Sequence, residues 1–268
     1  MSKSFDDLLS KLKVAEKKKL AVAVAQDEPV LEAVKAAKDR GIADAILVGN
    51  RAKIEEVAMK IDMDLTGFEI IHEEDVKKAA LKAIQLVSSG KADMVMKGLV
   101  DTATFLRSVL NKEVGLRTGK LMSHVSVFEL KGIDRLILLT DAAFNTYPDL
   151  KQKVEIINNS VMVAKACGIQ NPKVAPVCAV EVVNPDMPAT VDAALLSKMS
   201  DRGQIKGCIV DGPLALDNAL SEEAAHHKGV TGPVAGKADI LLLPNIGRRR
   251  SGRAWPAHGT GRGTCRRP

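Results

Sequence analysis

Residues 92–112 read Ala-Asp-Met-Val-Met-Lys-Gly-Leu-Val-Asp-Thr-Ala-Thr-Phe-Leu-Arg-Ser-Val-Leu-Asn-Lys, and this stretch decides how we interpret the fold. Its apolar residues 94–96 predict a buried strand, which Lys97-Gly98 ends. Asp101-Thr102 then precedes apolar residues at helical spacing, so either side chain can cap a helix by accepting a hydrogen bond from its first N–H groups. The stretch predicts a strand, a turn that contains glycine, and the start of a helix.

Such a turn favours an anion, because unpaired N–H groups at a helix start then lie at the carboxyl edge of a sheet. Lys97 adds positive charge, Thr102 and Thr104 lie in the first helical turn, and Arg107 follows about one turn later. The pattern fits a phosphate cradle. An ordinary strand–loop–helix unit with a surface lysine is the simpler interpretation until other residues support the cradle.

The composition is that of a soluble globular protein. The chain has 268 residues, 46% hydrophobic and 27% charged, enough for one large or two ordinary α/β domains. Aromatic residues make up only 3%, which argues against stacking platforms for single-stranded nucleic acid. No apolar run approaches the length of a membrane span, and the N-terminus lacks a signal peptide, so we expect a cytoplasmic protein without a membrane partner.

The sequence offers no metal or nucleotide motif. Its four cysteines, at 167, 178, 208 and 265, are too widely spaced for a paired metal-ligand motif, and Cys178 and Cys208 lie in apolar runs typical of buried residues. Clustered carboxylates and a glycine-rich Lys-Ser/Thr loop are missing as well. We therefore expect no metal and no permanently bound cofactor.

Residues 247–268 differ from the rest of the chain. They hold seven arginines and no acidic residue, which exceeds the net charge of +6, so the remainder is slightly acidic. The segment has no hydrophobic period, and its composition changes abruptly after residue 246. We interpret it as a reading-frame change or other sequence error, in preference to a basic arm for nucleic acid.

Strand and helix patterns alternate along residues 20–246, which predicts an α/β fold with parallel sheets covered on both faces. A helix is expected over residues 4–19, with the lysines at 17–19 at its solvated end. Residues 121–130 and 135–140 are strand-like with a short link, which predicts an antiparallel hairpin. We place the domain change there, giving domains 1–130 and 131–246 and the tail 247–268.

Polar side chains follow several predicted strands, where open α/β sheets bind ligands. Beyond the stretch around Lys97, these candidates are Ser123, His124, Asp141, Asn145, Glu181, Asn184, Asp211, Gly212, Pro213, Asp217 and Lys237. Each also has a structural explanation. His124 fits a buried imidazole, Asp141 with Asn145 a turn, and Asp211-Gly212-Pro213 another turn.

Six of these stretches, in this order, resemble the phosphate acetyl/butyryltransferase family. They are Met96-Lys97-Gly98-Leu99-Val100-Asp101-Thr102, Ser123-His124-Val125, Thr140-Asp141-Ala142-Ala143, Asn-Pro-Asp-Met-Pro-Ala-Thr-Val-Asp-Ala-Ala-Leu-Leu at 184–196, Asp-Gly-Pro-Leu-Ala-Leu-Asp at 211–217 and Val-Ala-Gly-Lys-Ala-Asp at 234–239. The resemblance covers residues 1–246. It implies a two-domain fold similar to that of isocitrate and isopropylmalate dehydrogenases, with the active site in an interdomain cleft.

The same resemblance implies a reversible reaction, butanoyl-CoA + phosphate → butanoyl phosphate + CoA, in a cytoplasmic homo-oligomer with CoA as a substrate. Cationic and N–H donors must hold phosphate against a thioester. We therefore assign catalytic roles to Arg107, Ser123 and Asn145, the last two as oxyanion donors. We assign substrate binding to Lys97, Gly98, Thr102, Thr104, His124, Asp141, Glu181, Asn184, Asp211, Gly212, Pro213, Asp217 and Lys237.

The sequence departs from the family after residue 246. Similar proteins continue with Glu-Ala-Gly-Asn and carry a Ser-Arg-Ala-Asp segment linked to phosphate binding, whereas residues 247–268 contain neither. We expect the C-terminal part to be lost and the 268-residue chain to have weak or no activity. The alternatives are a phosphate acetyltransferase or another short-chain acyltransferase, a nicotinamide-dependent dehydrogenase, which would want an Asp cluster for its metal, and a non-catalytic product with a nucleic-acid-binding tail.

Overall fold

The computed structural model describes residues 4–12 and 17–246, so the interpretation of the tail falls outside the described residues. The chain divides into two compact units, and each is described by itself. The first unit contains residues 9–12 and 17–119, and the second contains residues 4–8 and 120–246. The division precedes the boundary predicted at 130 and 131, because the strand that ends at Glu129 pairs with the following strand of the second unit.

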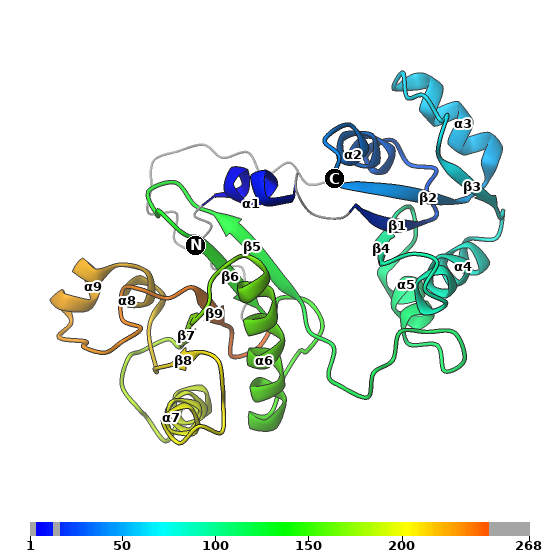
Figure 1. Cartoon of the computed structure of the whole chain (residues 1–268). Helices are drawn as coiled ribbons and strands as arrows, with labels where there is room; N and C mark the ends of the chain where they lie inside the picture. The colour runs from blue at the N-terminus through cyan, green and yellow to red at the C-terminus, as the bar shows by residue number, and fades with distance from the viewer. Residues whose placement is uncertain (1–3, 13–16, 247–268) are drawn as a thin grey trace. The chain divides into compact units, whose positions relative to one another are not determined.

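The first unit contains a parallel four-stranded sheet in the order β3-β2-β1-β4 (Figure 1). Its strands are β1 (Lys18–Ala23), β2 (Ala43–Gly49), β3 (Glu69–His72) and β4 (Met94–Lys97). Helices α2 (Glu28–Asp39) and α3 (Arg51–Lys60) pack on one face of the sheet, and α4 (Val76–Ser88) and α5 (Thr102–Val109) on the other. Burial on both faces confirms the predicted architecture.

The faces are separated by the alternation of side chains along each strand. Val22 of β1 packs with α2 and α3, whereas its neighbours Ala21 and Ala23 pack with α4. Caps fix the helix starts, since Asn50 accepts from the Lys53 amide and Asp75 from the Lys78 amide. Local sequence therefore sets the element bounds, and the strand period sets the faces.

The expected helix over residues 4–19 is wrong at its C-terminal end. Helix α1 covers Phe5–Leu12, and β1 begins at Lys18. Lys18 and Lys19 lie opposite Ala43 and Asp44 in the parallel ladder, so backbone pairing with β2 draws them into the sheet while their side chains stay exposed. An exposed lysine at the end of a strand destabilises the sheet little, so these residues can belong to a strand as easily as to a helix end.

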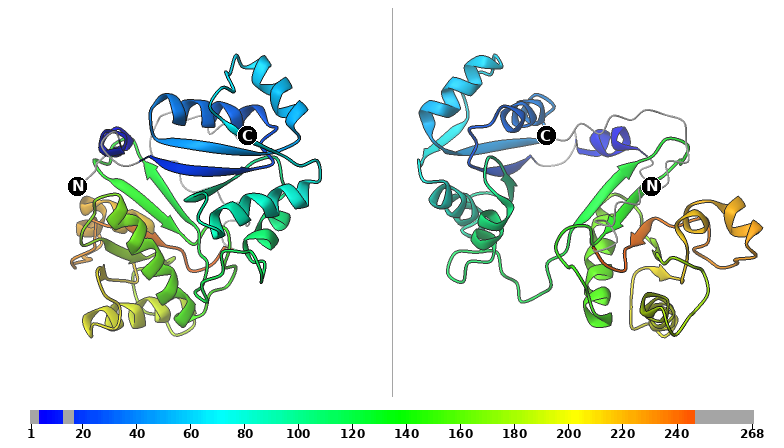
Figure 2. Two further views of the ribbon diagram at one scale, coloured as in Figure 1. Left: turned by 45° about the vertical axis from the view of Figure 1, so that its right-hand side comes forward. Right: turned by 180° about the vertical axis from the view of Figure 1, so that it is seen from behind.

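The second unit contains a five-stranded sheet in the order β5-β6-β9-β7-β8 (Figure 2). The strands are β5 (Val125–Glu129), β6 (Leu136–Thr140), β7 (Lys173–Pro176), β8 (Ile209–Val210) and β9 (Ile240–Leu242). Strands β6 to β9 are parallel, and β5 pairs antiparallel with β6, which confirms the predicted hairpin.

Helices cover both faces of this sheet too. Helices α6 (Leu150–Ala166) and α7 (Pro188–Asp201) bury residues such as Leu138 and Ile240, and α8 (Leu216–Leu220) packs on the opposite face over Ile137 and Leu241. Helix α9 (Glu222–His227) follows α8, and His226 and His227 are exposed on it. In the part of the chain that the structure describes, no helix is long and apolar enough to span a bilayer.

The described cysteines are packed side chains. Cys167 and Cys178 are buried, and Cys208 is half-buried. Burial raises the pKa of the Cys208 thiol to about 11, so the thiol is protonated at neutral pH and is a poor nucleophile. Among residues 4–12 and 17–246, no three His, Cys, Asp or Glu side chains gather as metal ligands.

Candidate active site

The turn after β4 lies at the point where the connections of the first sheet change direction. Strands β2 and β3 extend the sheet from one side of β1, and β4 adds to the other side, with Lys97 paired to Ala23 at the carboxyl end. In open α/β sheets, such a switch point is where ligands bind. The structure therefore places the Lys97–Arg107 stretch where its sequence predicted a ligand edge.

Gly98 is required there by close packing of backbone. A Cβ at this position would lie 2.3 Å from the Val24 carbonyl oxygen and 2.6 Å from that of Ala23. The Gly98 and Leu99 amides donate to these same oxygens, at 2.8 Å and 2.9 Å. The turn is thus fastened to the end of β1, and α5 starts at a fixed place beyond it.

The start of α5 is already occupied by a carboxylate of the chain. Asp101 caps the helix by accepting from the Thr104 amide at 2.9 Å. Hydrogen bonds from Thr104 lower the pKa of the Asp101 carboxyl first of all, and the charge of Arg107 adds a smaller decrease. An anion at this turn would therefore depend on cationic side chains more than on free backbone N–H groups.

The four polar side chains of the turn differ in exposure. Thr104 is buried, and its side chain hydrogen-bonds to the Asp101 carboxyl, so its hydroxyl is engaged within the turn. Lys97, Thr102 and Arg107 are exposed. Of these four candidates, Lys97, Thr102 and Arg107 are therefore the ones that a phosphate can reach.

The second unit brings Ser123, His124, Asp141 and Asn145 together at the carboxyl end of β6. The Thr140 hydroxyl donates to the His124 carbonyl at 2.9 Å, and the His124 ring meets Phe144 edge-on at 5.8 Å. Val125, at the start of β5, pairs with Thr140, at the end of β6. Because β5 is antiparallel to β6, its first residues lie beside the last residues of β6. The predicted hairpin therefore brings the residues before β5 to the carboxyl end of β6.

Asp141 organises this corner. It is 2% exposed, and its carboxylate accepts from the Ala143 and Phe144 amides at 2.8 Å and 3.0 Å and from the Asn145 side chain. The Asn145 side-chain nitrogen also donates to the Met122 carbonyl at 3.0 Å. Both hydrogens of that amide are therefore used within the protein.

Ser123 keeps a free donor, and sequence reasoning missed the reason. Asn159, in the middle of α6, donates to the Ser123 hydroxyl at 2.9 Å and to the Leu121 carbonyl at 2.9 Å. With its oxygen accepting from Asn159, the Ser123 hydroxyl can donate its own hydrogen to a ligand. The signal in the sequence was the polar run Asn158-Asn159-Ser160 inside a helix with an apolar face.

Asp211, Gly212 and Pro213 follow β8 at the same edge of the second sheet, but not in the same corner. Two strands, β9 and β7, separate β8 from β6, which places the two ends roughly 14 Å apart. The Gly212 amide donates to the Ser197 hydroxyl at 2.9 Å, and a Cβ at Gly232 would lie 2.2 Å from an Asp211 carboxylate oxygen. A ligand that contacts both Asp141 and Asp211 must be long.

Glu181 and Asp217 share one lysine, which sequence reasoning also missed. The Lys228 ammonium lies 3.7 Å from the Glu181 carboxylate and 3.0 Å from that of Asp217. Burial is the largest single influence on the Asp217 carboxyl and raises its pKa, but the hydrogen bond and charge of Lys228, together with backbone hydrogen bonds, make the net shift downward. Lys228 bridges the two carboxylates and offsets one of their two negative charges, so it links the loop after β7 to helix α8.

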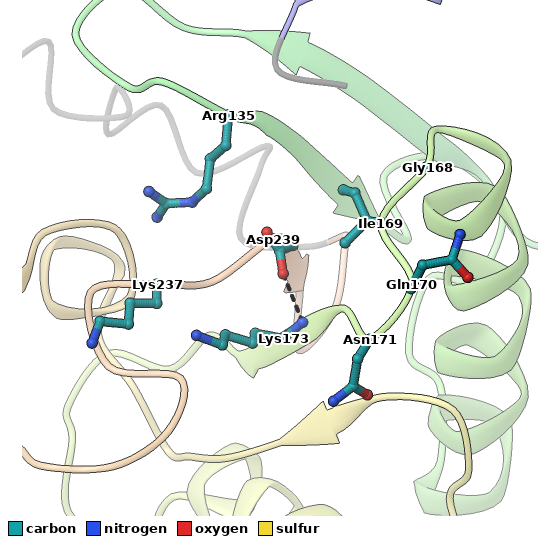
Figure 3. Close-up of a pocket in the computed structure, with 8 residues that line it drawn as sticks. All are labelled: Arg135, Gly168, Ile169, Gln170, Asn171, Lys173, Lys237 and Asp239. Atoms are coloured by element: carbon teal, nitrogen blue, oxygen red, sulfur yellow. Dashed lines mark hydrogen bonds between the residues drawn. The ribbon is translucent and has the colours of Figure 1, made fainter. Parts of the chain in front are cut away.

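Asn184 and Lys237 do not join the other candidates. The Asn184 backbone bonds to the Thr190 hydroxyl at 2.9 Å, and its side chain accepts from the Asp186 amide, so it shapes the loop that starts α7. Lys237 precedes β9 and therefore lies at the amino edge of the sheet, opposite to Asp141. Figure 3 shows Lys237 beside Arg135 and Lys173.

The charge of Asp211 leads to a prediction about stability and pH. Burial raises the pKa of its carboxyl above 3.8, the Gly212 amide opposes this, and Asp201 adds a smaller increase. Because the folded pKa is the higher one, ionisation destabilises the fold above that pKa and has no effect below the unfolded value. Asp211→Asn is expected to stabilise the chain at about pH 7, by less than about 1 kcal/mol because the carboxyl is half-exposed.

Urea unfolding of Asp211→Asn and the parent chain at about pH 7 and about pH 3 measures this difference. Near pH 3 the parent carboxyl is protonated in both states, so the advantage should vanish. An equal stabilisation at both pH values would show that charge is not the cause.

Together, two α/β units with polar turns at the carboxyl edges of their sheets define the class of open-sheet α/β protein, in which these edges are the candidate ligand sites. A model of the Phosphate acetyl/butaryl transferase family matches residues 4–80 and 71–250. The chain is 74% identical over 246 residues to a phosphate butyryltransferase of Clostridium acetobutylicum, covering 92% of this chain and 82% of the relative. It is 47% identical over 229 residues to a phosphate acetyltransferase of Thermotoga maritima, covering 85% and 78%.

A solved structure gives the same result. The crystal structure of a branched-chain phosphotransacylase from Enterococcus faecalis V583 matches with a TM-score of 0.73 and 31% identity over 86% of this chain and 80% of that one. The chain therefore belongs to the phosphate acetyl/butaryl transferase family. This confirms the resemblance seen in the sequence and the class it implied, a phosphate acyltransferase.

Proposed function

We propose that this chain transfers a butanoyl group reversibly between CoA and inorganic phosphate. The observation that carries the proposal is the 74% identity over 246 residues to the Clostridium acetobutylicum phosphate butyryltransferase. A phosphate butyryltransferase of Clostridium beijerinckii is 72% identical over the same length, which supports the same substrate. Acyl-CoA and phosphate act as substrates, and the proposal needs no permanently bound cofactor or metal.

In this reaction phosphate is the nucleophile, and it must be held close to the thioester carbonyl. Its negative charge makes this costly unless cationic side chains bind it. In this proposal Arg107 and Lys97, both exposed at the β4–α5 turn, bind the phosphate oxygens, and Thr102 adds a hydroxyl. The guanidinium of Arg107 suits this task because its planar donors fit two phosphate oxygens at once.

The carbonyl oxygen of the thioester gains negative charge when phosphate attacks, so it needs a donor. Ser123 fits that role, because Asn159 fills its acceptor side and leaves its hydrogen to donate. Asn145 fits a positioning role, since both its amide hydrogens are engaged by Asp141 and Met122. This differs from the sequence analysis, which gave both residues the same part.

The finer features of the fold belong to the same proposal. The two units would correspond to the two domains of an isocitrate/isopropylmalate dehydrogenase-like fold, with the active site in the cleft between them and with a C-terminal segment completing the first domain. A cytoplasmic homo-oligomer is part of it. The phosphotransacylase structure from Enterococcus faecalis supports the fold. The proposal names acyl-CoA, phosphate and acyl phosphate as partners and gives nucleic acid no role.

The main alternative is a phosphate acetyltransferase, and it is supported by the 47% identity to the relative from Thermotoga maritima. The preferred acyl chain distinguishes the two activities. Preference depends on pocket volume, and one methylene changes kcat/KM by about 10- to 200-fold. Rates of CoA release with acetyl-, butanoyl- and isobutanoyl-CoA therefore decide it. We expect butanoyl-CoA to be preferred, and a higher kcat/KM for acetyl-CoA would contradict the butanoyl assignment.

Residues 247–268 give a prediction about activity. Their composition lacks the Ser-Arg-Ala-Asp segment that the resemblance links to phosphate binding. In a chimera, they are replaced by the C-terminal segment of the Clostridium acetobutylicum relative. We expect CoA release from butanoyl-CoA and phosphate to be at least about 100-fold faster with the chimera, the usual effect of restoring one transition-state donor.

Equal, near-normal turnover by the 268-residue chain would refute the importance of that segment while leaving the acyltransferase assignment intact. No CoA release from the chimera with any of the three acyl-CoA substrates would refute the assignment itself. Sequencing the source DNA through codon 247 tests the reading-frame interpretation independently.

A further inference from the structure

A pocket of about 440 Å³ lies at the amino edge of the sheet in the second unit (Figure 3). Arg135 precedes β6, Lys173 opens β7, and Lys237 and Asp239 precede β9. Because these strands are parallel, this edge is opposite to the one that carries Asp141. The proposed acyl transfer does not use the pocket.

Arg135 is held rigidly in one wall of the pocket. Its Nε donates to the Ala238 carbonyl at 3.1 Å, and one terminal nitrogen donates to the carbonyls of Gly236 and Leu220 at 3.0 Å and 3.4 Å. The other terminal nitrogen has no acceptor among the residues that the structure describes. Arg135 therefore contributes a fixed positive charge and an unused donor.

Lys237 is placed by the tight loop around Gly236. Gly236 has φ +72°, and a Cβ there would lie 2.5 Å from the backbone of Glu222. The Lys237 ammonium is 3.8 Å from the Glu222 carboxylate, with both side chains about half or more exposed. Such a surface pair is worth little, so an anionic ligand can compete for Lys237.

Lys173 supplies the third charge. Its backbone amide donates to the Asp239 carboxylate at 2.8 Å, and the Asp239 amide donates to its carbonyl at 2.9 Å. Burial raises the pKa of the Asp239 carboxyl, and the Lys173 amide and the charges of Arg135 and Lys173 partly oppose this rise, so the Lys173 ammonium acts on Asp239 through its charge. Figure 3 shows the Lys173, Lys237 and Arg135 charged ends turned toward the same side of the pocket.

The charges do not cancel within the pocket. Asp239 is the only acidic side chain among the lining residues, and it is 5% exposed, with one oxygen engaged by the Lys173 amide. Three cations, with the buried Asp239 and the exposed Glu222 as their acidic neighbours, leave an excess of positive charge facing solvent, which attracts anions. The volume falls within the range of small-molecule sites.

We propose that this pocket is a second ligand site that binds a small polyanion carrying at least two phosphate groups. Two phosphates offer more oxygens to cations from three separate segments of the chain, and their higher charge gains more from the excess of positive charge than a single phosphate does. The proposed site also gives a role to the Val234–Asp239 stretch, because Lys237 lines the pocket and Gly236 allows the tight loop that positions it. Arg135 positions that loop and contributes charge.

Isothermal titration of the full 268-residue chain with pyrophosphate tests the site. All titrations use an Arg107→Ala background, so that the phosphate site of the proposed reaction contributes little heat. We expect Lys173→Gln and Lys237→Gln each to raise the Kd for pyrophosphate by about 10-fold or more, because each removes a charge-assisted contact. Orthophosphate should bind the background chain more weakly than pyrophosphate.

Two variants serve as controls. Lys53→Gln removes an exposed lysine of α3 in the first unit, changes the net charge equally, and should leave the Kd within about twofold. Lys173→Arg keeps the charge and should restore most of the affinity, which separates ligand binding from a folding defect. Failure of the background chain to bind pyrophosphate, or an unchanged Kd in both glutamine variants, would overturn the proposal without touching the acyltransferase assignment.

Discussion

Gly98→Ala is expected to destabilise the β4–α5 turn by about 3 kcal/mol. The new methyl group would lie 2.3 Å from the Val24 carbonyl oxygen and 2.6 Å from that of Ala23, at the end of β1, and backbone cannot rotate away as a side chain can. Relief of the clash requires the turn to move, which breaks the Gly98 and Leu99 hydrogen bonds to these oxygens. Overpacking and two lost bonds together account for about this magnitude.

Hydrogen exchange measured by mass spectrometry checks the effect locally, which suits a chain of two units. Peptides that cover β4 and α5 should lose protection by about two orders of magnitude, and peptides from the second unit should not change. Gly119→Ala is the matched control, because a Cβ there meets nothing within 4 Å and only its φ of +76° costs stability. We expect about 1 kcal/mol for that control. Equal protection in Gly98→Ala and the parent would show that the turn tolerates a side chain.

Arg107→Ala is expected to lower kcat/KM for phosphate by about 100- to 1,000-fold in the active chimera. Arg107 is an exposed cation in the last turn of the short helix α5, and the Asp101 cap uses the Thr104 amide at the helix start. Phosphate binding at this edge therefore relies on the guanidinium. Loss of an interaction made in the ground and transition states raises the KM for phosphate, and loss of one made only in the transition state lowers kcat.

Arg107→Lys keeps the charge but loses the planar pair of donors, so its kcat/KM should lie between those of the alanine variant and the parent. Arg40→Ala removes an exposed arginine at the end of α2 and is the matched control for charge. Its kinetics should equal those of the parent. Activity of Arg107→Ala within about threefold of the parent would remove Arg107 from the site.

Element type and helix starts could be predicted from the sequence because they depend on neighbours in the chain. The alternation of strands and helices, the β5–β6 hairpin and the Asp101 cap all follow from local periodicity and capping. The start of β1 could not be predicted, because Lys18 and Lys19 are strand residues only through their pairing with β2.

The candidate site was predictable in part for the same reason. Polar residues after apolar runs mark strand ends, so Lys97, Asp141 and Asp211 were found where parallel strands finish. Asn159 and Lys228 lie inside or after helices, where polar residues usually face water. Only their contacts with Ser123 and with Glu181 and Asp217 reveal their roles.

By itself the sequence determined the family, the two α/β halves and the turn at Gly98, since motifs and periodicity are properties of contiguous residues. Tertiary structure alone decided the strand order β5-β6-β9-β7-β8, because insertion of β9 between β6 and β7 depends on packing between segments far apart in the chain. That order separates Asp141 from Asp211 by two strands, while the direction of β9 puts Lys237 at the amino edge. Tertiary hydrogen bonds then determined which donors are used: the Asn145 amide donates to Asp141 and Met122, whereas the Ser123 hydroxyl accepts from Asn159 and has no acceptor of its own among residues 4–12 and 17–246.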